Sequence, residues 1–236
     1  MEDRYLYLLI DFLSIIFPLI FSFHPLGKFY KKWKYLWPAI VIPALFFIAW
    51  DVLFTSMGVW SFNERYLTGI MIFNLPLEEV LFFICIPYAC AFTYDSVNIL
   101  SGKERISAQG QNFITDLLIF GLLITGALHI DRWYTSVTFI LTALFLVFIR
   151  RVWKPDFVGK FYFAFVFILI PFFIVNGVLT GSMIDEPIVR YNDSENLGIR
   201  MFTIPFEDTF YGMLLLMMNI SIFEYLQKKK GPPGAS

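Results

Sequence analysis

Long apolar runs recur along the whole chain, and they constrain its fold more than any other feature. We place seven of them at residues 5–23, 34–55, 77–98, 113–131, 134–151, 160–181 and 206–227. A helix of about 20 residues crosses a hydrocarbon layer of roughly 30 Å. Only 16% of the residues are charged, which is too few for a surface that faces water on all sides. The sequence therefore predicts an all-α polytopic membrane protein with seven transmembrane helices.

The basic residues predict the orientation of these helices, because cytoplasmic loops carry an excess of Lys and Arg. With seven spans, the loops on one side hold thirteen such residues and those on the other side hold five. The richer side has Lys28, Lys31, Lys32, Lys34, Lys103, Arg105, Arg150, Arg151, Lys154, Lys160, Lys228, Lys229 and Lys230, and the poorer side has Arg4, Arg65, Arg132, Arg190 and Arg200. We expect the N-terminus outside and the C-terminus in the cytoplasm.

The chain also repeats itself. Residues 69–80 read GIMIFNLPLEEV and residues 198–209 read GIRMFTIPFEDT, at an offset of 129. We match Tyr5 with Tyr134 at the same offset, and residues 50–55 with 175–180 at an offset of 125. The expected domains are a first three-helix repeat at 1–100, a linker helix at 101–131, a second three-helix repeat at 132–228 and a flexible tail at 229–236. One intervening span makes this 3+1+3 arrangement a parallel repeat.

Each repeat opens its last helix with Pro-x-Glu-acid, which supplies Glu78, Glu79, Glu207 and Asp208. Helix capping is the alternative explanation, with Asn74 and Thr203 as the caps. Adjacent residues point about 100° apart on a helix, so both acids of a doublet cannot serve one cap. Ionisable groups at membrane depth are costly and therefore indicate function. Two carboxyls in different surroundings can act as an acid and a base.

Other chemistries find little support in the sequence. No Gly-x-Gly-x-x-Gly or P-loop motif is present, and the seventh span has no lysine for a Schiff base. His24 and His129 lie far apart, so we expect no metal or haem pair. Cys85 and Cys90 are five residues apart in one apolar run, which favours two small packed residues over a disulfide. A net charge of −1 gives no indication of nucleic-acid binding.

The doubled Pro-Leu-Glu-Glu and Pro-Phe-Glu-Asp, each opening a membrane helix, resembles the lycopene cyclases of the heterodimeric and fused-heterodimer type over residues 1–228. The resemblance implies a multi-pass protein of the bacterial inner membrane that cyclises the linear ends of lycopene to β rings, giving γ- and β-carotene. A proton enters at C2 and another leaves from C6, so no cofactor is expected. The implied catalytic group is Glu78, Glu79, Glu207 and Asp208.

A second set of residues is expected to bind the substrate and to stabilise its cation, because aromatic faces attract positive charge. This set comprises Asp51, its counterpart Asn176, and the aromatic residues Trp50, Trp60, Phe73, Phe82, Phe83, Phe202, Phe210 and Tyr211. Simple packing is the alternative for each ring, because the chain holds 29 Phe residues. The expected partners are lycopene, other carotenoid polyenes and membrane lipid. Homo-oligomers and association with other carotenoid enzymes are left open.

Two other functions remain as alternatives. Small transporters also use 3+1+3 parallel repeats, but they need a polar path through the midplane, whereas the acids here gather at one end of the helices. A scaffold that binds carotenoids or quinones without chemistry would not need doubled acids. The sequence leaves open whether the ring is β or ε, whether one or both ends react, and which acid is the donor.

Overall fold

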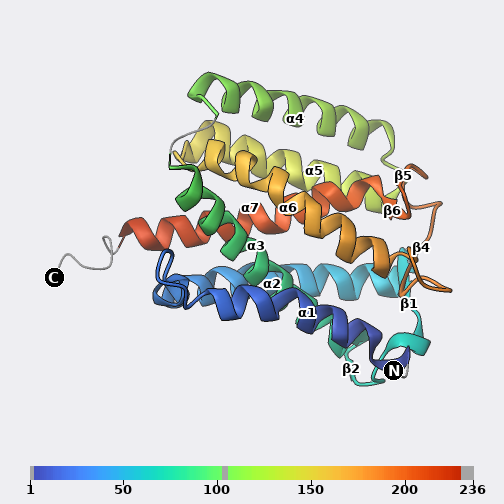
Figure 1. Ribbon diagram of the computed structural model, residues 1–236. Helices are drawn as coiled ribbons and strands as arrows, with labels where there is room; N and C mark the ends of the chain where they lie inside the picture. The colour runs from blue at the N-terminus through green and yellow to red at the C-terminus, as the bar shows by residue number, and fades with distance from the viewer. Residues whose placement is uncertain (1–2, 103–105, 230–236) are drawn as a thin grey trace. The chain divides into compact units, whose positions relative to one another are not determined.

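The computed structural model describes residues 3–102 and 106–229, and most of them are helical (Figure 1). Seven helices in this part of the chain are long and apolar enough to cross a membrane, which confirms the predicted fold class. They are α1 (Leu6–Phe21), α2 (Trp33–Met57), α3 (Leu77–Ser101), α4 (Ala108–Leu128), α5 (Trp133–Val147), α6 (Val158–Leu179) and α7 (Phe206–Lys229).

The helix boundaries differ from the predicted ones by a few residues, for local reasons. A short 3₁₀ turn, η2 (Phe29–Lys32), precedes α2, so this span begins earlier than expected. α4 begins at Ala108 because the Ser107 side chain caps it by accepting a hydrogen bond from the Gly110 N–H. A π-helical stretch, η4 (Phe148–Trp153), continues α5.

Three of the basic residues used for orientation, Lys103, Arg105 and Lys230, lie outside the described residues, as does the predicted tail beyond Lys229. Lys229 itself is the last residue of α7. The orientation, the 3+1+3 repeat and the domain boundaries remain predictions.

The chain divides into two compact units. The first comprises Met1–Ser56, Phe62–Gly102 and Leu215–Ser236, and the second comprises Met57–Ser61 and Lys103–Leu214. The first unit therefore contains α1, α2, α3 and the later part of α7. The second contains α4, α5, α6 and the early part of α7, so α7 contributes to both.

In the first unit, α1 and α3 lie side by side and run in the same direction. Tyr7 bonds to Glu79 near the start of both helices, and further along the Ser22 hydroxyl lies 2.7 Å from the Tyr88 hydroxyl. Between α2 and α3, the rings of Phe47 and Phe83 pack with their centroids 6.2 Å apart. These contacts hold the beginnings of α1 and α3 at one level.

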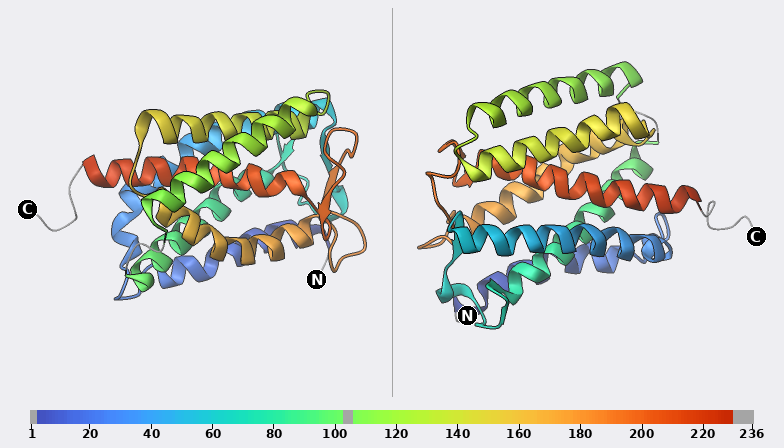
Figure 2. Two further views of the ribbon diagram at one scale, coloured as in Figure 1. Left: turned by 90° about the horizontal axis from the view of Figure 1, so that it is seen from above. Right: turned by 180° about the vertical axis from the view of Figure 1, so that it is seen from behind.

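In the second unit, α4 lies along α5 in every view (Figure 1, Figure 2). Gly126 permits this approach, because a Cβ atom there would meet Ile140 at 3.0 Å. α5 and the start of α7 run in the same direction, since Tyr134 bonds to Asp208 and the Thr142 hydroxyl donates to the Phe210 carbonyl at 3.4 Å. The beginnings of α5 and α7 thus lie together, as those of α1 and α3 do in the first unit.

Short strands precede the two acid-bearing helices. β2 (Met71–Ile72) and β3 (Leu75–Pro76) form a tight antiparallel hairpin before α3, and β5 (Arg200–Met201) and β6 (Ile204–Pro205) form another before α7. β1 (Trp60–Phe62) pairs with β4 (Val189–Tyr191). The two hairpins deliver the chain directly into the first turns that carry Glu78 and Glu207.

Candidate active site

The acid doublets do not follow the capping scheme that the sequence suggested. Pro76 occupies the N-cap position of α3 in an extended conformation, without a side-chain cap. Asn74 instead donates to the Val52 carbonyl at 2.9 Å. The Thr203 hydroxyl lies 2.7 Å from the hydroxyls of both Thr180 and Ser182. The alternative explanation, in which Asn74 caps α3, is therefore wrong, because the Asn74 side chain makes a long-range hydrogen bond instead.

The first acid of each doublet holds the loop that comes before it. Glu78 accepts a hydrogen bond of 2.7 Å from the Thr68 N–H, and Glu207 accepts one of 2.7 Å from the Leu197 N–H. Both glutamates are fully buried. In each, the Oε1 atom makes this bond, and the Oε2 atom is buried with no hydrogen-bond partner among the described residues. In each glutamate, one carboxyl oxygen thus positions the loop, and the other is not engaged in a hydrogen bond within the described residues.

The second acid of each doublet accepts a hydrogen bond from a buried tyrosine of the neighbouring helix. Tyr7 of α1 donates to Glu79 at 2.6 Å. Tyr134 of α5 donates to Asp208, which also accepts from Tyr191 at 3.1 Å. The tyrosine that corresponds to Tyr134 by its contact is therefore Tyr7. The match of Tyr5 with Tyr134 in the sequence repeat remains a prediction, but Tyr5 does not make the corresponding contact, since its side chain is 43% exposed.

The loops that contact the first acids are built alike in the two units. The Asn63 side chain accepts from the Arg65 N–H at 3.2 Å, and 129 positions later the Asn192 side chain accepts from the Ser194 N–H at 3.1 Å. Each loop is also bound by an arginine, which precedes α1 in the first unit and α5 in the second. Arg4 donates to the Thr68 carbonyl at 2.6 Å, and Arg132 donates to the Asn196 carbonyl. Both loops thus present a backbone N–H to a buried glutamate.

An ion pair stabilises the second of these loops. Arg200 donates to Asp193, and Asn196 donates to the same carboxylate at 3.2 Å. Partial burial raises the pKa of Asp193, but the hydrogen bonds from Arg200 and Asn196 outweigh this effect, so that its pKa lies below the ordinary value of 3.8. The loop is therefore held by a carboxylate that stays ionised.

Two more carboxyls lie near the first doublet. Asp51, which the sequence put forward, is buried on α2 and interacts electrostatically with Tyr7. Asp11 of α1 is 1% exposed and interacts with both Glu78 and Glu79. Asp11 was not predicted from the sequence, although a single acid within the run Leu-Leu-Ile-Asp-Phe-Leu indicates function in a membrane helix.

A series of aromatic ring contacts leads to Tyr7 in the first unit. Tyr7 meets Phe82 edge-on at 6.4 Å, and Phe82 meets Phe83 at 5.9 Å. Trp50 stacks on Phe47 at 5.5 Å, and Phe47 in turn contacts Phe83. Three predicted aromatic residues, Trp50, Phe82 and Phe83, are therefore joined through ring contacts to the tyrosine that bonds Glu79.

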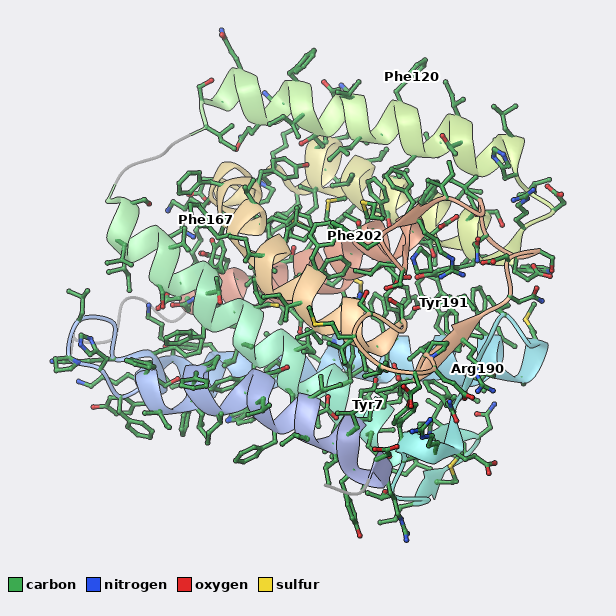
Figure 3. All side chains as sticks on the ribbon, turned by 45° about the vertical axis from the view of Figure 1, so that its right-hand side comes forward. Tyr7, Phe120, Phe167, Arg190, Tyr191 and Phe202 are labelled. Carbon is green, nitrogen blue, oxygen red and sulfur yellow. The ribbon has the colours of Figure 1, made fainter. Side chains whose placement is uncertain are left out.

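The second unit has its own aromatic cluster, around Asp208. Tyr134 and Tyr191 stack with centroids 5.6 Å apart, and Trp60 meets Tyr134 edge-on at 5.3 Å. Tyr211 completes the cluster at 6.3 Å from both Trp60 and Tyr134. Figure 3 shows Tyr7 on α1 and Tyr191 on β4. Two of the four rings, Trp60 and Tyr211, were predicted from the sequence.

Four other predicted residues have different surroundings. Phe210 packs against Phe139 at 5.2 Å on the α5 side of α7. Asn176 is half-buried on α6, and in the described part of the chain no hydrogen bond joins its side chain to Glu207 or Asp208. Phe73 and Phe202 are 84% and 90% exposed at the hairpin turns. The last two rings therefore do not line the buried clusters.

Hydroxyl groups on α1 and α5 that bond to the acids were also not predicted from the sequence. Besides Tyr7 and Tyr134, the buried Thr135 donates to Glu207 at 2.5 Å. Tyrosine and threonine are common in membrane helices, so nothing in their local sequence separates these from their neighbours. Only the packing of α5 on α7 identifies Thr135.

A family of known proteins is similar to this chain over most of its length. The family model described as "Lycopene cyclase" matches residues 4–97 and 131–226, which together make up most of the chain. The chain belongs to the lycopene cyclase family. Both acid doublets, and both tyrosines that bond to their second acids, lie within the matched segments. The resemblance noted from the sequence is thereby confirmed.

Individual members of the family match over shorter stretches. A protein named lycopene beta-cyclase from Halobacterium salinarum is 38% identical over 58 residues, or 22% of this chain and 24% of that protein. A bifunctional lycopene cyclase/phytoene synthase from Phycomyces blakesleeanus is 36% identical over 63 residues, or 26% of this chain and 10% of that protein. The chain thus spans a quarter or less of the length of these relatives. No solved structure matches it.

Proposed function

We propose that this chain is a membrane-embedded lycopene cyclase that closes the linear ends of lycopene into β rings, giving γ- and β-carotene. The observation that carries the proposal is the pair of buried acid doublets, each held by a backbone N–H and a tyrosine hydroxyl beside buried aromatic rings. The family match supports it, as does the name lycopene beta-cyclase of the Halobacterium salinarum relative.

The chemistry suits a protein of membrane helices. Lycopene is a polyene hydrocarbon, so the bilayer is its solvent. A proton added at C2 of the terminal double bond leaves a tertiary cation at C1, and the C5–C6 double bond attacks this carbon. Loss of the proton from C6 then gives the β ring. One proton enters and one leaves, so substrate and product are isomers and the reaction needs no redox cofactor.

The residues divide this work between them. Glu78, Glu79, Glu207 and Asp208 form the acid–base group. The second acids are in turn positioned by Tyr7 and Tyr134. A buried carboxyl pair in which one member has better hydrogen-bond donors can hold a proton on one and a charge on the other. The rings around each doublet offer their faces to the cation.

We propose that the two predicted repeats are not equivalent. Asp51 in the first corresponds to Asn176 in the second, so the carboxyl count differs between them. We therefore propose that one site serves both ends of the substrate in turn. The protein is further proposed to lie in the bacterial inner membrane with its C-terminus in the cytoplasm, and to accept other linear carotenoid ends.

Expression in bacteria that accumulate lycopene tests the proposal. Pigments are separated by chromatography for the wild type, Glu78→Gln, Glu207→Gln and the control Glu224→Gln. Glu224 also lies on α7, 17 residues after Glu207, but it is only half-buried and accepts a hydrogen bond from Tyr94. Conversion in the wild type and control, with loss in the two other variants, supports the cyclase.

Unchanged lycopene, with the protein shown to be in the membrane, would argue against this substrate and favour another polyene or a transporter. Retained lycopene binding in all variants without any conversion would favour a scaffold. Conversion that survives both Glu78→Gln and Glu207→Gln would remove these residues from the chemistry.

A further inference from the structure

Asp11 is an ionisable side chain that no step of the proposed reaction uses so far. It lies in the second turn of α1 within an apolar stretch, and it is 1% exposed. Both of its carboxyl oxygens are buried, and neither has a hydrogen-bond partner among the described residues. Buried polar groups are nearly always hydrogen-bonded, so a carboxyl in this state calls for an explanation.

The surroundings of Asp11 are acidic and apolar. On α3, the groups that interact with it are Glu78, Glu79 and the thiol of Cys85. From its own helix it faces Tyr7, which interacts in turn with Asp51 of α2. Each of the ionisable groups that interact with it is an acid, a thiol or a phenol.

The hydrogen bonds separate Asp11 from its neighbour Glu79. Glu79 accepts from the Tyr7 hydroxyl at 2.6 Å, and a hydrogen bond of this kind stabilises a carboxylate. Asp11 has no such donor, and a bare carboxylate is far more costly to bury than a carboxylic acid. Adjacent carboxyls in an apolar site also do not all ionise together. The geometry thus leaves the charge on Glu79 and the proton on Asp11.

We propose that Asp11 is the acid that starts cyclisation in the first unit, an inference that rests on the proposed function. Its O–H bond breaks as the electrons of the terminal double bond form the C2–H bond, which leaves the cation at C1. The C5–C6 electrons then close the ring. The Glu79 carboxylate removes the C6 proton and returns it to Asp11, so both residues and the proton count are restored.

The second unit has no equivalent acid. Tyr7 and Tyr134 occupy corresponding places by their bonds to Glu79 and Asp208, and four residues further along α5 stands Thr138. Thr138 is fully buried, and its hydroxyl has no hydrogen-bond partner in residues 3–102 and 106–229. A threonine cannot supply the initiating proton. On this proposal Asp11 protonates both ends of the substrate in turn.

The test measures protonation and turnover separately. We would purify four proteins into lipid vesicles: the wild type, Asp11→Asn, Asp11→Glu and the control Asp116→Asn. Asp116 of α4 forms an ion pair with Arg150, which follows α5. Infrared spectroscopy without any carotenoid records the C=O stretching band of protonated carboxyls. Lycopene turnover is measured on the same samples, and thermal unfolding verifies that each variant is folded.

We expect the band to lose the intensity that Asp11 contributes in Asp11→Asn, and to keep its full intensity in the control. Turnover should fall by roughly 100-fold or more in Asp11→Asn, as for loss of a general acid, and should partly return in Asp11→Glu. An unchanged band in folded Asp11→Asn would overturn the inference, as would a weakened band with normal turnover. A wild type that shows the band but no turnover would overturn the proposed function and the donor role with it, while the protonated state of Asp11 would stand.

Discussion

The Tyr7 hydroxyl donates a hydrogen bond of 2.6 Å to Glu79 across 72 positions of the sequence. Tyr134 makes the same kind of contact with Asp208 across 74 positions. Each bond ties the start of one membrane helix to the first turn of another, where the acids lie. The position of each doublet therefore depends on the packing of two helices rather than on a cap of its own helix.

Removing either tyrosine hydroxyl should weaken both folding and activity. A hydrogen bond to a charged group contributes about 1.5–3 kcal/mol, so Tyr7→Phe and Tyr134→Phe should each lower the free energy of unfolding by roughly that amount. Tyr5→Phe is the matched control, because Tyr5 is exposed and should change little. Unfolding is followed in detergent and turnover in vesicles. Equal stability of Tyr7→Phe and Tyr5→Phe would contradict the role given to the bond.

Substitutions of Glu78 should separate anchoring from chemistry. Glu78→Gln keeps a carbonyl oxygen that can accept from the Thr68 N–H, whereas Glu78→Ala leaves this N–H without its partner. We expect both variants to lose turnover, but only Glu78→Ala to lose about 1–3 kcal/mol of stability. Limited proteolysis of the 63–69 loop together with thermal unfolding distinguishes them. The same pattern is expected at Glu207 and the Leu197 N–H.

The hairpin turns store backbone strain that a better turn residue would remove. Phe73 and Phe202 have φ angles of 56° and 59°, a left-handed conformation that costs ordinary residues about 1–2 kcal/mol. Asn tolerates this conformation, so Phe73→Asn and Phe202→Asn should raise the unfolding free energy by about 1 kcal/mol. Phe73→Ala is the control, since it removes the ring and keeps the strain. Equal stability of the Asn and Ala variants would refute this explanation.

The ion pair of Asp193 should make stability fall in acid. Because the folded-state pKa lies below the ordinary 3.8, the contribution of Asp193 is fully present above that value. It is lost as the pH drops through the lowered pKa. The difference in melting temperature between wild type and Asp193→Asn should be present at pH 5 and disappear near pH 2. In an Arg200→Gln background the difference should be smaller at pH 5, because the main donor is gone.

Two glycines of α4 should respond in opposite ways to alanine. A Cβ atom at Gly126 would lie 3.0 Å from Ile140 and 3.3 Å from Phe139, so Gly126→Ala should cost about 1–3 kcal/mol by overpacking. At Gly121 nothing lies within 4 Å, so Gly121→Ala should be neutral or stabilise by up to about 1 kcal/mol through helix propensity. Thermal unfolding of the pair checks this. Destabilisation by Gly121→Ala alone would contradict the described α4–α5 contact.

The sequence by itself determined the seven membrane helices and the acid doublets that open α3 and α7. Both follow from local quantities. The free energy of transfer into lipid sums over about 20 consecutive residues, and an acid inside such a run is conspicuous wherever its neighbours in space lie. The similarity of residues 69–80 to residues 198–209 is also visible in the sequence alone, and it identified both doublets.

The tertiary structure decided which groups meet those acids. Tyr5 and Tyr7 cannot be distinguished in the sequence, but of these two it is Tyr7 that bonds to Glu79 of α3. Asn74 lies just before α3, but its side chain donates to the Val52 carbonyl instead of capping the helix. Asp11 likewise faces Glu78 and Glu79 only because α1 lies along α3. Such contacts depend on how each helix is rotated against its neighbour, which is set by packing along the whole length of both helices. No short stretch of sequence contains that information.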